Sequence, residues 1–154
     1  MVAYALLVII AVSISVIVYP YLKEYLPLDT PECPEDMTLI VESAVCDTTD
    51  EELIVSLSNR GLFTVPAAFI RLGDIDREIR FQANNGIEFF PQGPLIPGAK
   101  TNLTAYNITD IFNKTEEQNG LILEVQPAIF EDHKLIPCED AVISQKIECH
   151  AIGG

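Results

Sequence analysis

The chain has 154 residues, which is room for one compact domain. Its 23 acidic and 9 basic side chains give a net charge of -14, and all of them lie between Lys23 and Glu148. The acidic balance excludes a nucleic-acid partner, because binding phosphates requires a concentrated basic surface. The absence of charge before Lys23 excludes an ordinary cytosolic globular protein.

Residues 1–26 are predicted to form a hydrophobic helix. An uncharged stretch of 22 residues makes a helix roughly 33 Å long, which matches the hydrocarbon thickness of a bilayer. A helix that is hydrophobic all round must be buried in lipid or in protein. We therefore expect a polymerisation or transmembrane helix, whose surface includes Tyr4, Leu6, Leu7, Ile9, Ile10, Ile14 and Ile17.

Three uses of such a helix compete. A cleaved secretory signal requires a basic leader and a small-residue cleavage site, and neither is seen here. A plain membrane anchor fits the length, with Tyr19, Tyr21 and Tyr25 at the interface. Topology is normally set by Lys or Arg on the cytoplasmic side, yet none precedes the span. We interpret this gap as a basic leader that has been removed, which leaves the apolar helix as the mature N-terminus.

The segment from Tyr4 to Tyr19, followed by a polar stalk and an all-β head, resembles the mature N-terminus of archaeal type IV pilins and archaellins. The resemblance implies that a prepilin-type peptidase removes a short charged leader. It also implies that the helix waits in the membrane and then packs with its neighbours into the core of a filament. Ala5 stands where bacterial pilins carry a glutamate, so the archaeal branch is the better match.

Prolines mark the connection between helix and head. Pro20 is expected to kink the helix without ending it, because neighbouring helices can compensate the lost hydrogen bond. Pro27 is expected to end it. Residues 27–36, which also contain Pro31 and Pro34, are predicted to be a stiff hinge.

Residues 37–154 are predicted to form an all-β head, because hydrophobic residues alternate there with polar ones. Met37, Leu39, Val41 and Val45 are expected to face one way. Seven or so short strands between turns are typical of a β-sandwich or small barrel. The expected strands include Leu53–Leu57, Ala68–Leu72, Ile75–Phe81 after a loop at Gly73 and Asp74, Thr101–Tyr106, Leu121–Phe130 and Ala141–Cys149.

The Pro-Gly turn in Leu95–Gly98 resembles one that is common in extracellular immunoglobulin-like modules. It supports an immunoglobulin-like sandwich, so the expected fold class is α+β. The polar turn Asp47–Glu52 carries four acidic side chains, but it lacks the spacing of a calcium-binding EF-hand loop and is interpreted as solvated. The apolar stretch Ile87–Pro91 is interpreted as core packing first and as a subunit or adhesion contact second.

Four cysteines flank the first and last expected strands of the head, at Cys33, Cys46, Cys138 and Cys149. The two intervals are of similar length, which suggests that these strands lie side by side with one disulfide at each end. Antiparallel strands would pair Cys33 with Cys149, whereas parallel strands would pair Cys33 with Cys138; local hairpin bonds remain open. The short spacings of a zinc site are absent. Disulfides place the head outside the cell.

Three glycosylation sequons fall within fourteen residues, at Asn102, Asn107 and Asn113. If Leu103 points into the core, Asn102 points outward, as a glycan requires. The alternative is a strand and loop that are merely polar. We expect N-linked glycans on at least one site.

The motifs of enzymes do not appear: the two histidines, His133 and His150, are solitary, and there is no nucleotide-binding loop or cofactor fingerprint. We therefore expect no catalysis and no cofactor. The sequence predicts a structural subunit of an extracellular archaeal type IV pilus-like filament, used for adhesion or motility. Its partners would be copies of itself and, before assembly, the cell membrane. The alternative is a monomeric, membrane-anchored surface binding module with an immunoglobulin-like ectodomain.

Overall fold

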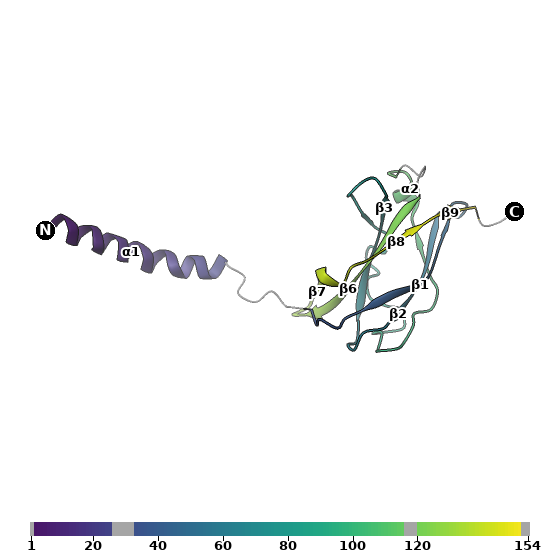
Figure 1. The fold of residues 1–154 in the computed structure, drawn as a ribbon, viewed down its shortest axis with the longest axis horizontal. Helices are drawn as coiled ribbons and strands as arrows, with labels where there is room; N and C mark the ends of the chain where they lie inside the picture. The colour runs from purple at the N-terminus through teal and green to yellow at the C-terminus, as the bar shows by residue number, and fades with distance from the viewer. Residues whose placement is uncertain (1, 26–32, 116–119, 152–154) are drawn as a thin grey trace. The chain divides into compact units, whose positions relative to one another are not determined.

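A computed structural model describes residues 2–25, 33–115 and 120–151 of the chain. The architecture is α+β, with an apolar helix followed by a sheet-rich region (Figure 1). The chain divides into two compact units, Met1–Pro31 and Glu32–Gly154, so Cys33 to Asp36 belong to the second unit. Pro27, the second expected hinge residue, lies outside the described residues.

The described residues of the first unit form one helix, α1 (Val2–Tyr25), which has 24 residues. At 1.5 Å per residue it is about 36 Å long. Pro20 lies inside the helix and does not end it. The many β-branched side chains are compatible with this structure, because a helix satisfies its own backbone hydrogen bonds where water is excluded.

The second unit, which we call the head, consists of short strands joined by turns (Figure 1). Two short helical segments, α2 (Thr109–Phe112) and η2 (Glu139–Ala141), interrupt the strands. The strands are β1 (Leu39–Asp47), β2 (Glu52–Asn59), β3 (Ala67–Asp74), β4 (Phe81–Gln82), β5 (Thr104–Asn107), β6 (Leu121–Glu131), β7 (Lys134–Pro137), β8 (Ile143–Ile147) and β9 (Cys149–His150).

The strands form two sheets. One has the order β5-β2-β1-β9, and the other has the order β4-β3-β6-β7, with β8 also paired to β6. Both β7 and β8 run antiparallel to β6, β7 beside residues 128–131 and β8 beside residues 121–125. They therefore act as one edge strand that is interrupted at Cys138 and η2. The chain then crosses to the other sheet, where β9 pairs in parallel with β1.

One hydrophobic core takes side chains from both sheets. The alternation predicted for β2 and β3 is confirmed, since their inward residues are almost completely buried. The core includes Leu39, Leu53, Val55, Leu57, Ile70, Leu72, Leu121, Leu123 and Val125.

The alternation predicted for β1 is wrong beyond Val41. Met37 and Leu39 are buried as expected, but Val45 is exposed. The register with β2 shifts between Val41 and Ser43, so Glu42 is an extra residue in a β-bulge. One inserted residue moves the side chains that follow to the opposite face, and Cys46 is consequently buried.

Three other strand predictions need correction. Strand β3 continues through Gly73 and Asp74, and the segment from Ile75 to Arg80 is a loop. Arg80 holds this loop back against the sheet: its guanidinium donates to the carbonyl oxygen of Asp74 at 3.1 Å and bonds to the Glu124 carboxylate at 2.9 Å. Only Phe81 and Gln82 then pair with β3.

The strand expected over Thr101–Tyr106 begins later, at Thr104. Leu103 is 66% exposed rather than buried, because Thr101 is the buried residue that fixes this segment. Its hydroxyl accepts a hydrogen bond from the main-chain nitrogen of Leu57 at 2.8 Å. The strand expected over Ala141–Cys149 is divided between the two sheets as β8 and β9.

Candidate functional site

The described surface of α1, from Tyr4 to Tyr21, is apolar on every side. All side chains from Tyr4 to Tyr21 are exposed within the chain, and these include the seven residues expected on the polymerisation surface. This segment is the one candidate membrane span among the described residues, with a mean hydropathy of 2.2 over 18 residues. A surface of this kind is not stable in water and requires an apolar environment.

The two serines of α1 do not create a polar face. The hydroxyl of Ser13 donates to the carbonyl oxygen of Ile9 at 2.7 Å, and that of Ser15 donates to the carbonyl oxygen of Ala11 at 2.9 Å. Such bonds to the preceding turn satisfy a hydroxyl within its own helix. The described middle of α1 can therefore pack against apolar partners on any side without burying an unsatisfied side chain.

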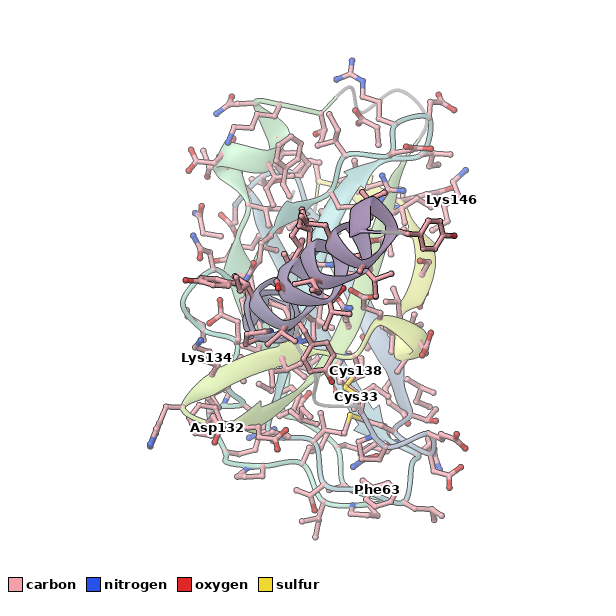
Figure 2. The ribbon with its side chains drawn as sticks, turned by 90° about the vertical axis from the view of Figure 1, so that its left-hand side faces the viewer. Cys33, Phe63, Asp132, Lys134, Cys138 and Lys146 are labelled. Carbon is pink, nitrogen blue, oxygen red and sulfur yellow. A yellow bond between two sulfur atoms is a disulfide. The ribbon has the colours of Figure 1, made fainter. Side chains whose placement is uncertain are left out.

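Two disulfides close the head, and they connect the same two segments of chain. Cys33 bonds to Cys138 with a Cα separation of 5.5 Å (Figure 2). Cys46 bonds to Cys149 with a Cα separation of 4.5 Å. This is the pairing expected for parallel neighbouring strands, and β1 and β9 are indeed parallel at Cys46 and Cys149. The disulfides indicate an extracellular head, and the apolar helix indicates a membrane anchor or a signal sequence.

The three sequon asparagines lie on or beside β5 and α2, and all three are exposed. Asn102 precedes β5, Asn107 is its last residue, and Asn113 follows α2. The middle residues of the first two sequons differ: Leu103 is exposed, whereas Ile108 is buried in the core. The expected inward direction of Leu103 is wrong, but the exposure expected for Asn102 is found.

An exposed aromatic cluster was not predicted from the sequence. The rings of Phe89 and Phe130 meet edge to face with centroids 5.5 Å apart, and His133 lies 6.5 Å beyond Phe130. The stretch Ile87–Pro91 is divided, because Phe90 is buried while Ile87 and Phe89 are exposed. The alternation of Phe89 and Phe90 about the sheet is the signal that could have separated them.

Charged groups are arranged in small surface pairs. The carboxylate of Glu42, at the β-bulge, contacts Lys100 at 3.0 Å and Arg60 at 3.2 Å. The hydrogen bond from Lys100 is the main cause that lowers the pKa of Glu42, with a smaller contribution from Arg60. Among the described residues, no group of three or more His, Cys, Asp or Glu side chains could hold a metal ion.

A shallow hollow of about 480 Å³ lies over the Cys46 end of β1, with Lys146 and Glu148 among its lining residues. It is open to solvent. The chemistry that stands out in this chain is therefore the apolar surface of α1, joined by sequence to a disulfide-closed, acidic head.

No family model, no curated protein and no solved structure matches this chain. The function of the chain is therefore inferred from its residues and their geometry.

Proposed function

We propose that the protein is a structural subunit of an extracellular archaeal type IV pilus-like filament, which polymerises through α1. The observation that carries this proposal is that the described middle of α1 has no polar side, since even Ser13 and Ser15 bond to their own helix. A helix in a bundle of like helices is covered on all sides by apolar neighbours. The surface of α1 supports such a position.

The filament geometry follows from the nature of this contact. Helices that pack side by side with an axial offset use different faces on the two partners. Such a heterologous contact does not close on itself and propagates as a fibre. Before assembly, the same surface is suited to the membrane, because about 36 Å of helix spans the hydrocarbon of a bilayer.

We infer that the head is an immunoglobulin-like sandwich that forms the outer surface of the filament. In immunoglobulin domains strands A, B and E share one sheet, and strands C, F and G share the other. Here β1, β2 and β5 share one sheet, and β3, β6 and β8 share the other. Strand β4 pairs with β3, which is the position of strand C′ in variable-type domains.

We further propose N-linked glycans on this outer surface. The exposure of Asn102, Asn107 and Asn113 supports it, because an acceptor nitrogen must be reachable. Glycans and the net charge of -14 would both keep heads from associating nonspecifically. Association would then be directed to the helices.

The proposal is tested by electron microscopy of material sheared from the cell surface, paired with mass spectrometry of the native N-terminus. Filaments composed of this chain with a processed N-terminus would support polymerisation. A detergent-soluble monomer with an unprocessed N-terminus would contradict it and favour the membrane-anchored binding module.

A further inference from the structure

The two disulfides and the segments between them form one closed covalent ring. One half of the ring is residues 33–46, and the other half is residues 138–149. The Cys33–Cys138 and Cys46–Cys149 bonds join the two halves at their ends. The first half contains β1 of one sheet, and the second half contains β8 of the other sheet. The ring therefore joins the two sheets covalently along one side of the head.

On this side of the head the two sheets are not joined by a continuous hydrogen-bonded ladder. Strand β1 pairs with β2 along its length, but on its other side it pairs with β9 only at Cys46 and Asp47. The edge strand of the second sheet is interrupted at Cys138, although the Cys138 nitrogen still donates to the carbonyl oxygen of Pro127 at 2.9 Å. Without the disulfides, β1 would be held in its sheet by its pairing with β2 and, at Cys46 and Asp47, with β9.

In the sequence, α1 precedes the ring, because Cys33 is the first described residue of the head. A force transmitted from α1 must enter the head at Cys33. From there it reaches Cys138 directly through a disulfide, which bypasses a sequence separation of 105 residues. Strands β1 to β7 lie in the bypassed segment.

We propose that this ring is a force-bearing clamp, which carries load from the α1 end of the head to its C-terminal edge and keeps the remaining strands from unravelling. The two halves of the ring lie in parallel between Cys33 and the Cys46–Cys149 bond. Load on one half is therefore shared by the other, and β1 cannot peel unless β8 and β9 detach as well. This inference concerns the head alone and holds whether α1 assembles into a filament or anchors a monomer.

The test is single-molecule force spectroscopy of the full chain in detergent micelles, pulled from its two ends. In the oxidised protein the path from Cys33 to Cys149 is short, so the head releases only a short extension. Reduction, or replacement of all four cysteines by serine, frees the bypassed 105 residues and adds about 370 Å at some 3.5 Å per residue. Unwinding of α1 contributes equally in every case and cancels.

A second variant distinguishes a ring of two disulfides from a single disulfide cross-link. In C33S/C138S the Cys46–Cys149 bond still bypasses 103 residues, so the total extension stays short. The segment before Cys46 is no longer held in parallel, and we expect an added early step at lower force as β1 peels. The proposal is overturned if the oxidised wild type extends as far as the reduced protein, or if C33S/C138S shows no early step.

Discussion

The side-chain amide of Asn59 donates to the main-chain carbonyl oxygen of Leu95 at 2.7 Å, from a fully buried position at the end of β2. The same nitrogen donates to the carbonyl oxygen of Phe63 at 2.8 Å, and Oδ1 accepts from the nitrogen of Gly61 at 3.0 Å. One side chain therefore fixes the turn after β2 and the segment at Leu95.

Replacing Asn59 with alanine is expected to destabilise the head by about 2 kcal/mol, because buried main-chain groups lose a partner. Urea unfolding of the full chain in detergent, followed by circular dichroism, measures this loss. Asn85 is an exposed asparagine elsewhere in the head, and Asn85→Ala should change stability by less than about 0.5 kcal/mol. Equal effects of the two variants would contradict the role given to Asn59.

Gly61 is packed against the main chain that precedes β1. A Cβ atom at this position would overlap the carbonyl oxygen of Asp36 and lie 2.6 Å from the nitrogen of Thr38. Main-chain atoms cannot turn aside as a flexible side chain can, so Gly61→Ala should cost about 1 to 3 kcal/mol in the same urea experiment. The neighbouring Leu62 is 73% exposed, and Leu62→Ala serves as the control with little expected effect. A neutral Gly61→Ala would show that the Asp36 segment moves freely.

The sequence was sufficient for the regular parts of the fold and insufficient where one residue changes the register. An uninterrupted uncharged, apolar stretch identified α1, and alternating hydrophobic residues identified β2 and β3. The alternation failed at Glu42, since a β-bulge has no composition signal of its own, and the outward turn of Val45 followed. It also missed β7, whose hairpin turns at Asp132 and His133 with φ values of 48° and 63°. The strongest sequence signal for such a hairpin is Asn-Gly or Asp-Gly, and here His133 stands in the place of the glycine.

The candidate site likewise has features that the sequence reveals and features that it does not. The apolar surface of α1 and the cysteines are visible in the sequence, because each depends on residue type and spacing. The pairing of Cys33 with Cys138 depends on whether two distant strands run parallel, which spacing alone leaves open. The contact between Phe89 and Phe130 joins residues far apart in the chain, and no local pattern marks it.

The contacts of Glu42 predict that the stability of the head depends slightly on pH. The pKa of Glu42 is lowered from 4.5 in the folded chain, mainly by the hydrogen bond from Lys100. A lowered folded pKa gives stability that is present above the unfolded pKa and is lost as the pH falls through the folded value. The destabilisation caused by Glu42→Gln should therefore be larger at neutral pH than well below pH 4.5. Urea unfolding at both pH values measures it.

Glu139 is exposed in η2, and Glu139→Gln provides the matched control for Glu42→Gln. It removes the same charge without removing the contacts to Lys100 and Arg60. A pH dependence that is the same for both variants would mean that overall charge, and not these contacts, sets the effect.

Glycosylation of the sequons predicts a heavier native protein. Protein purified from its native host should be heavier than the unmodified chain by the mass of its glycans. Replacing Asn102, Asn107 and Asn113 together with glutamine should remove this added mass, which intact mass spectrometry measures. Asn85→Gln changes an asparagine outside any sequon and should leave the glycan mass in place. A native mass equal to that of the unmodified chain would contradict the proposal of N-linked glycans.

Polymerisation through α1 is tested most directly by photo-crosslinking in native cells. A photoreactive amino acid replaces Ile10, in the middle of the apolar surface, and the cell-surface material is irradiated. A helix packed among its copies should give a ladder of covalent dimers, trimers and higher multimers. Chains cross-linked only to lipid, or recovered only as monomers, would contradict the central claim.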